Sequence, residues 1–344
     1  MGKIGVLISV ETNIEFPVIN DFLKKICMHI AASNPISLSS SDIEENLIST
    51  DPNLRVAFIA DQSLSPDAIA VLNLIKAEEA DMVLHQGDFD YVHDHFGWYE
   101  MISNVLLEIE PDVVIHLGAM TGVDSCEKEE SMAFDINTKS TQIIAQQCSI
   151  LNTFLVYVST DYVFDGNSGM YYESSTPNPL SIYGKSKLEG EKAVQNFSTN
   201  WCIARTSTPF GLHPTKKSFP MWVIENLQKQ KQIDVLIDQF TSPTYIPNLS
   251  RMLIEISERH ITGIIHAAGA SKISRYQMAS MVSDKLNLDG TLLKQISMNK
   301  MKWVAQRPKD SSLDVSRASS ILNEKPQKID QSLNLFIDEM KSKN

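Results

Sequence analysis

The stretches TFLVYVSTDYVFDG, residues 153–166, and SIYGKSKLEGEKAV, residues 181–194, decide the fold class. The first begins with an apolar run rich in β-branched and aromatic residues, which is typical of a buried strand, and Ser159 and Thr160 follow it directly. The second has the spacing of an amphipathic helix, on which Tyr183 and Lys187 stand four residues apart and share one face. In parallel α/β sheets the ligand lies at the carboxyl ends of the strands, so these side chains are candidates for a site.

The rest of the chain repeats this alternation of short apolar runs and helical patterns. Apolar residues recur at three- and four-residue spacing in segments 65–79, 99–110, 127–149 and 183–197, which predicts helices. The alternation predicts a doubly wound, Rossmann-like α/β fold with a parallel sheet. The candidate strands are KIGVLISV (3–10), RVAFIA (55–60), DMVLHQ (81–86), DVVIHLG (112–118), TFLVYVS (153–159), WCIAR (201–205) and GIIHAAG (263–269).

Two unequal parts are predicted along the chain. Residues 1–206 would form the nucleotide-binding domain, with an atypical segment over residues 1–100. Residues 207–344 would form mainly a smaller substrate-binding lobe, with some strands returning to the sheet, because the alternation fades toward the carboxyl terminus.

Composition excludes several classes of partner. The chain has 344 residues, of which 43% are hydrophobic, and a net charge of -12, which disfavours nucleic acid and anionic membranes. Its four cysteines are far apart and form no C-x-x-C motif, so a reducing cytoplasm is expected and no metal site is predicted from them. The apolar run at the amino terminus is interrupted by Glu11 and Glu15, so it predicts a strand rather than a membrane span. A homodimer is left open.

Tyr183, Lys187 and Thr160 have the chemistry of carbonyl reduction. An ammonium close to a phenol favours the phenolate, so Lys187 is expected to lower the pKa of Tyr183 toward the range of an acid-base catalyst. Thr160 would donate a hydrogen bond to the same substrate oxygen. The alternative is a surface lysine beside a half-buried tyrosine, because this spacing also arises by chance.

Several ordered motifs between residues 108 and 313 resemble the extended short-chain dehydrogenase/reductases. Within this superfamily of sugar-nucleotide reductases and epimerases, the chain is most similar to dTDP-4-dehydrorhamnose reductase and its relatives. The similar stretches are EPDVVIHLGAMTGVDSCE (110–127), DINTKSTQIIAQQC (135–148), STDYVFDG (159–166), YGKSKLEGE (183–191), DQFTSPTYIPNLS (238–250) and RPKDSSLD (307–314).

The resemblance implies a role for each matching residue. The implied catalytic residues are Thr160, Tyr183, Lys187 and Asn137, the last supporting a proton relay; the implied cofactor contacts, to NADP or NAD, are Ala119, Ser159, Tyr183 and Lys187; the implied nucleotide-sugar contacts are Asp238, Gln239, Pro243, Thr244 and Arg307. Asn137 could instead be an ordinary helix residue, and the Asp238-Gln239 pair could be a simple turn.

The amino-terminal hundred residues depart from this family. A dinucleotide-binding enzyme needs a glycine-rich turn after its first strand, so that backbone can approach the pyrophosphate. ETNIEFP follows the run at 3–10 and DQSLSPDA follows the run at 55–60, and neither contains glycine. Weak cofactor binding is therefore expected. Residues 55–90 could still form a β-α-β unit, with Ser63 and Ser65 at the helix start and Asp88 or Asp90 after the second strand.

Residues 55–98 also show a weak similarity to the start of a calcineurin-type metallophosphoesterase. Asp61, Asp88, His93 and His95 could provide metal ligands for hydrolysis of a phosphate ester. The similarity is incomplete, because DQS stands where D-x-H is expected and no G-N-H-[DE] motif follows. A solvent-facing loop rich in histidine and aspartate is the simpler interpretation.

The sequence therefore predicts an NAD(P)H-dependent reductase of a nucleotide-activated keto sugar. The alternative is a non-catalytic binding or regulatory subunit of the same fold, comparable to the regulatory subunit of methionine adenosyltransferase. Such a subunit would tolerate the loss of the glycine-rich turn, whereas Thr160, Tyr183 and Lys187 favour catalysis.

Overall fold

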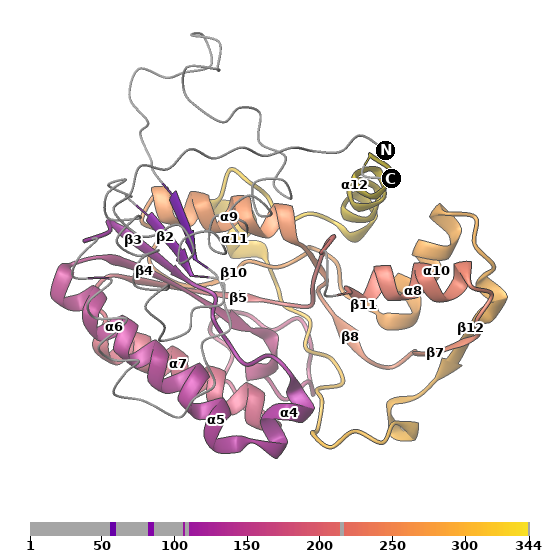
Figure 1. Cartoon of the computed structure of the whole chain (residues 1–344), viewed down its shortest axis with the longest axis horizontal. Coiled ribbons are helices and arrows are strands. Elements are labelled where there is room, and N and C mark those ends of the chain that lie inside the picture. Colours follow the sequence, from indigo (N-terminus) through magenta and orange to yellow (C-terminus); the bar gives the residue numbers. More distant parts are fainter. Residues whose placement is uncertain (1–55, 60–81, 86–105, 107–109, 214–216, 343–344) are drawn as a thin grey trace, which may run out of the picture.

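A parallel sheet forms the centre of the computed structural model, which describes residues 56–59, 82–85, 106, 110–213 and 217–342 (Figure 1). The sheet has six strands in the order β1-β2-β3-β4-β5-β10, and every pairing is parallel. The predicted Rossmann-like fold is thus confirmed. The predicted strand at 3–10, the helix at 65–79 and most of the helix at 99–110 lie outside the described residues. The strands are β1 (Val56–Ile59), β2 (Met82–His85), β3 (Val113–His116), β4 (Phe154–Thr160), β5 (Trp201–Thr206) and β10 (Gly263–His266).

Helices cover both faces of this sheet (Figure 1). Helices α6 (Ser140–Leu151) and α7 (Ile182–Phe197) lie on one face, and α9 (Ile246–Glu258) and α11 (Ser316–Ile321) lie on the other. Successive strand residues point to opposite faces. In β4, Leu155 and Tyr157 pack with the core under α6 and α7, while Phe154 and Val156 pack with the core under α9. The doubly wound arrangement therefore follows from strands whose apolar residues are buried on both faces of the sheet.

The connection from β3 to β4 is helical but not a single straight helix. It contains α4 (Val123–Lys128), α5 (Glu130–Phe134), a π-helical turn (Asp135–Lys139) and α6. The predicted helix at 127–149 is thus present, but it starts earlier and is broken at Glu129. π-Helical turns are uncommon and often occur at functional sites, and this turn carries Asn137.

A second lobe with its own core follows the main part of the sheet. Its buried residues come from α8 (Phe219–Gln228), α10 (Arg275–Lys285), α12 (Ile329–Ser342) and the strand pair β7 (Ile233–Leu236) and β12 (Leu293–Ile296). The short pairs are β6 (Pro209–Phe210) with β9 (Thr244–Tyr245), and β8 (Phe240–Thr241) with β11 (Ile273–Ser274). Strand β10 lies between β9 and β11 along the chain, but it belongs to the central sheet. The boundary between residues 206 and 207 remains a prediction.

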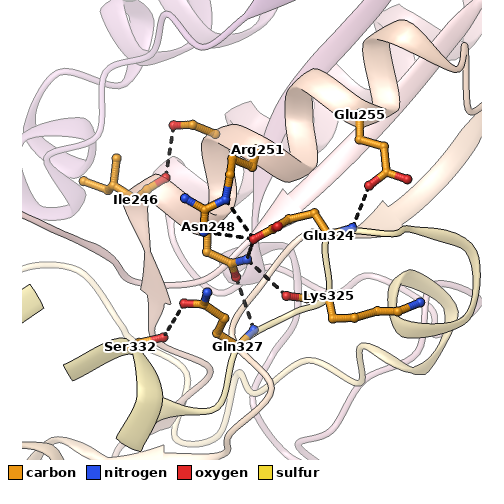
Figure 2. Close-up of polar contacts among 9 residues, drawn as sticks. Ile246, Asn248, Arg251, Glu255, Glu324, Lys325, Gln327 and Ser332 are labelled. Atoms are coloured by element: carbon orange, nitrogen blue, oxygen red, sulfur yellow. Dashed lines mark hydrogen bonds and ion pairs between the residues drawn. The ribbon is translucent and has the colours of Figure 1, made fainter. Parts of the chain in front are cut away.

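A polar clamp ties α9, on the sheet, to the segment that leads into α12 (Figure 2). Asn248 is buried, and its Nδ2 donates to Glu324 Oε1 (2.5 Å) and to the carbonyl oxygen of Lys325 (3.1 Å). Its Oδ1 accepts from the backbone N–H of Gln327 (3.2 Å). Two turns later on α9, Glu255 accepts the backbone N–H of Glu324 (2.8 Å). These bonds hold the entry to α12 against the sheet layer.

Two properties of the described residues bear on function. None of the described helices is both long and apolar enough to cross a membrane. In the same part of the chain, no group of three or more His, Cys, Asp or Glu side chains is placed to hold a metal ion.

Candidate active site

The carboxyl end of β4 meets the first turn of α7 at Thr160 and Tyr183. Ser181 caps α7 by accepting the N–H of Gly184 (3.3 Å). A Cβ at Gly184 would lie 2.2 Å from the carbonyl oxygen of Tyr162, so only glycine allows this approach of helix to strand end. The Thr160 hydroxyl lies close enough to the Tyr183 phenol to act on its pKa as a hydrogen-bond partner. The predicted convergence of these two side chains is therefore present in the structure.

The pKa of Tyr183 does not shift as the sequence led us to expect. Burial raises it, and the hydrogen bond from Thr160 only partly offsets this. Lys187 is not among the groups that act on Tyr183, so the expected lowering by the ammonium is wrong for this state of the protein. The spacing on the helix was right, but the ammonium turns toward the strand.

Lys187 is buried beneath the site, with 2% of its surface exposed. Its Nζ donates to the carbonyl oxygen of Val158 (2.8 Å) and lies 4.0 Å from the centre of the Tyr157 ring. Burial lowers the pKa of Lys187 to about 7, although the carboxylate of Glu191 acts to raise it. The ammonium is thus close to losing its proton at neutral pH.

A buried ion pair lies one turn further along α7. Arg205 of β5 donates through Nε and Nη2 to the two carboxylate oxygens of Glu191 (2.9 and 2.7 Å), and both side chains are 2% exposed. Ser159 donates its hydroxyl to the same carboxylate (2.5 Å). Ser159, predicted to contact the cofactor, therefore has its hydroxyl bound within the protein. The pair fixes α7 against β4 and β5.

Asn137 holds the loop after β3 against α7. Its Oδ1 accepts the N–H of Met120 (2.8 Å), and its Nδ2 donates to the carbonyl oxygen of Met120 (3.1 Å) and to Ser186 Oγ (2.9 Å). Ala119, a predicted cofactor contact, immediately precedes this fixed residue and is partly exposed. These contacts give Asn137 a positioning role, and its part in a proton relay stays a prediction.

Asp161 received no role from the sequence, although it lies within the STDYVFDG motif. It is buried and accepts hydroxyl hydrogen bonds from Thr160 (3.2 Å), Ser207 (2.8 Å) and Ser311 (2.5 Å). Burial raises its pKa despite these bonds. Asp161 therefore joins the end of β4, the end of β5 and the carboxyl-terminal segment around one carboxyl group. The signal in the sequence was an aspartate that directly follows the two hydroxyl residues at the strand end.

Two of the predicted sugar-nucleotide residues are near the catalytic pair. Gln239 lies close enough to the phenol of Tyr162 to lower its pKa as a hydrogen-bond partner, against the larger effect of burial. The Tyr162 ring packs edge-on against Tyr183 with centroids 5.7 Å apart. Arg307 forms a bidentate ion pair with Asp124, with both N–O distances 2.9 Å. Hydrogen bonding to Arg307 is the main reason that the pKa of Asp124 falls to about 2.

The other three predicted substrate residues have their polar groups bound within the protein. Asp238 accepts from Ser297 Oγ (2.5 Å) and from the N–H of Met298 (2.8 Å). Thr244 donates to the carbonyl oxygen of Ser207 (2.8 Å) and accepts the N–H of Gly269 (3.0 Å). Pro243 is buried, and its carbonyl would lie 2.0 Å from a Cβ at Gly269. Direct contact with substrate stays a prediction for these three residues.

Comparison with known proteins agrees with this arrangement. The family model described as RmlD substrate binding domain matches residues 66–342. The chain belongs to this family. Among its relatives is dTDP-4-dehydrorhamnose reductase of Aggregatibacter actinomycetemcomitans, which is 32% identical over 239 residues, covering 66% of this chain and 81% of the relative. The resemblance inferred from the sequence is thus confirmed.

A solved structure and a second relative complete the comparison of this RmlD-family chain. The crystal structure of dTDP-4-dehydrorhamnose reductase from Bacillus anthracis in complex with NADP has a TM-score of 0.70 and 27% identity, covering 83% of this chain and 99% of that one. Methionine adenosyltransferase 2 subunit beta of Bos taurus is 29% identical over 229 residues, covering 64% of this chain and 68% of the relative.

The amino-terminal segment has a separate match. A family model described as elongation factor TS matches residues 1–75, which fits the atypical character predicted for residues 1–100. The predicted phosphoesterase ligands Asp61, Asp88, His93 and His95 lie outside the described residues, so that hypothesis stays a prediction. The same holds for Ser63, Ser65 and Asp90 of the predicted β-α-β unit, of which strands β1 and β2 are described.

Proposed function

We propose that this chain reduces the keto group of a nucleotide-activated sugar with NADPH or NADH, as dTDP-4-dehydrorhamnose reductase does. The meeting of Thr160, at the carboxyl end of β4, with Tyr183, in the first turn of α7, carries this proposal. The two relatives named dTDP-4-dehydrorhamnose reductase support the choice of substrate class.

The two hydroxyls would act on one substrate oxygen. A carbonyl placed between Thr160 and Tyr183 would accept a hydrogen bond from Tyr183 and, once the single hydroxyl proton of Thr160 turns away from Asp161, from Thr160 as well. Both donors would stabilise the negative charge that develops there. Because burial keeps the pKa of Tyr183 high, its phenol retains the proton until a more basic alkoxide forms. Tyr183 would then donate that proton, and the Lys187 ammonium would have to turn from the carbonyl oxygen of Val158 toward the phenolate to stabilise it.

The residues on this edge fit the nicotinamide half of the cofactor, which supplies the hydride when bound. An ammonium has three N–H donors, and Lys187 uses one for Val158, so donors remain for ribose hydroxyls. Tyr183 and Ala119 would contact the same nicotinamide half of the cofactor. The sequence has no glycine-rich turn for the pyrophosphate half, so we expect weak overall affinity.

Steady-state kinetics of Tyr183→Phe test the function. With dTDP-4-dehydrorhamnose as substrate, the unaltered protein should oxidise NADPH or NADH. The kcat of the variant should be about 10²–10⁴-fold lower, because proton transfer by a positioned acid typically accelerates a reaction by that factor. Tyr172→Phe is a matched control, since Tyr172 is 58% exposed. Both variants should melt at the temperature of the unaltered protein. Full activity in Tyr183→Phe would refute the assigned role.

A non-catalytic role is the second candidate, and a regulatory relative supports it. Methionine adenosyltransferase 2 subunit beta is a subunit by name, and the missing glycine-rich turn is compatible with a protein that binds without turnover. Calorimetric titration with NADPH and NADH separates the two candidates. Binding of a dinucleotide without turnover would favour the subunit. A cytoplasmic location and a homodimer also remain proposals, and light scattering after gel filtration tests the dimer.

A further inference from the structure

Helix α4 is hydrogen-bonded both to the carboxyl-terminal segment and to the start of α7. The carboxylate of Asp124 binds the segment, because it accepts the N–H of Ala305 (3.0 Å) and two bonds from Arg307. Glu127 follows Asp124 by three residues, and its Oε2 accepts the backbone N–H of Ile182 (3.0 Å). Two carboxylates of one short helix therefore bind two segments that are far apart in the sequence.

The bond from Glu127 lies directly beside the candidate acid. Ile182 is the first residue of α7 and Tyr183 is the second. The first N–H groups of a helix have no partner inside it, and a carboxylate is favourable there because it faces the positive end of the helix dipole. Since Ser181 accepts the N–H of Gly184 (3.3 Å), side chains bind the N–H groups of the residues before and after Tyr183.

The packing of α4 supports the same contact. Cys126, which stands between the two carboxylates in the sequence, is fully buried in one apolar cluster with Ile182, and Tyr183 packs against this cluster. The Sγ of Cys126 donates to the carbonyl oxygen of Met120 (3.4 Å), which also accepts from Asn137 (3.1 Å). Helix α4 is thus fixed in the core beneath the first turn of α7, and it can support that turn.

We propose that Glu127 is a positioning residue that holds the first turn of α7, and with it the Tyr183 phenol, opposite Thr160. The inference rests on the proposed function, in which Tyr183 donates a proton to the substrate oxygen. A displacement of about 1 Å at a reacting group can reduce a rate by about 100-fold, so a loosened helix start should slow the chemical step. Asp124 acts instead on Arg307, a predicted substrate contact. The two carboxylates should therefore affect different kinetic constants.

Steady-state kinetics of Glu127→Ala, Glu127→Gln and the control Glu130→Ala test this role, and Glu130 is exposed at the start of α5. Glu127→Ala should lower kcat about 10- to 100-fold, with KM for the sugar nucleotide within about twofold of that of the unaltered protein. Glutamine keeps an oxygen that accepts the N–H of Ile182, so Glu127→Gln should retain kcat to within about threefold. Glu130→Ala should match the unaltered protein. An unchanged kcat in Glu127→Ala, or equal losses in the alanine and glutamine variants, would overturn the inference.

Amide hydrogen exchange tests the same contact without turnover. In Glu127→Ala the backbone amides of residues 182–184 should exchange about 10- to 100-fold faster, because loss of a hydrogen bond to a charged group favours local opening by about that factor. Amides in the last two turns of α7 should keep their rates, and Glu127→Gln should resemble the unaltered protein. Equal exchange at residues 182–184 in Glu127→Ala and the unaltered protein would overturn the inference while leaving the proposed function intact. Failure of the unaltered protein to reduce the keto sugar would refute the proposed function, and the exchange rates alone would then decide whether Glu127 holds the turn that carries Tyr183.

Discussion

The buried ammonium of Lys187 should make the stability of the protein depend on pH in a defined window. Each pKa unit corresponds to about 1.36 kcal/mol. Lowering the pKa of Lys187 from 10.5 to about 7 therefore costs on the order of 5 kcal/mol of folding free energy below pH 7. The unfolded chain keeps this proton up to about pH 10.5, while the folded chain loses it above pH 7. Because the unfolded state binds more protons between these values, the cost is relieved as pH rises through the window.

Lys187→Met removes the ammonium while keeping a side chain of similar length. The variant loses the hydrogen bond to Val158, which reduces stability by about 1–3 kcal/mol. At pH 6 the relief of desolvation is the larger effect, so the variant should be more stable than the unaltered protein. Above pH 7 this advantage should shrink by about 1.36 kcal/mol per pH unit, or about 3 kcal/mol by pH 9.

Urea denaturation at pH 6, 7, 8 and 9 measures the difference between the two proteins. Lys185→Met is the matched control, because Lys185 is exposed on the same helix and its replacement should leave the difference independent of pH. A stability difference that stays constant from pH 6 to 9 would refute the account of Lys187 as a desolvated cation. So would a difference that grows with pH.

Two further substitutions test contacts that surround the site. Asp124→Asn removes the ion pair that orients Arg307. A partly exposed pair contributes roughly 0–1 kcal/mol. In steady-state kinetics we therefore expect KM for the sugar nucleotide to rise at most about fivefold, with kcat unchanged. A large fall in kcat would contradict this. Asn248→Ala opens the clamp of Figure 2. It should lower the free energy of unfolding, measured by urea denaturation, by about 1–3 kcal/mol. Ser250→Ala, at an exposed position of the same helix, should have little effect. Equal stability of these two variants would show that the clamp is not needed.

The strands of the described sheet were predictable because their signal is local. Apolar runs such as 154–158 and 202–204 are buried on both faces of the sheet, and such runs are readable from composition alone. Strand order was not predictable in the same way. The pairing of β10 with β5 joins residues about sixty positions apart across α8 and α9, so it depends on packing that spacing does not report.

The site was predictable where it depends on one helix and one strand end. Tyr183 and Thr160 met these conditions, and they meet in the structure. The direction of the Lys187 side chain did not follow from spacing, because its packing over Tyr157 and its hydrogen bond to the carbonyl oxygen of Val158 decide its rotamer. A four-residue interval places two side chains on one face but does not aim their charged ends at each other.

Contacts between residues that are far apart in the sequence explain the remaining differences between the predicted and the observed site. Asp161 depends on hydroxyls 46 and 150 residues away, and Arg307 depends on a carboxylate 183 residues away.

The catalytic edge and the amino-terminal segment are separable in physical terms. Within the part of the chain that the structure describes, the hydrogen bonds of Thr160, Lys187, Asp161 and Asn137 come from residues 120 to 311, all beyond the match to elongation factor TS at 1–75. A replaced or divergent amino terminus would therefore leave Thr160, Tyr183 and the residues that support them in position. The affinity for the pyrophosphate half of a dinucleotide is a different matter, because it depends on the turn after the first strand. Intact catalytic geometry and an absent glycine-rich turn are thus compatible in one chain.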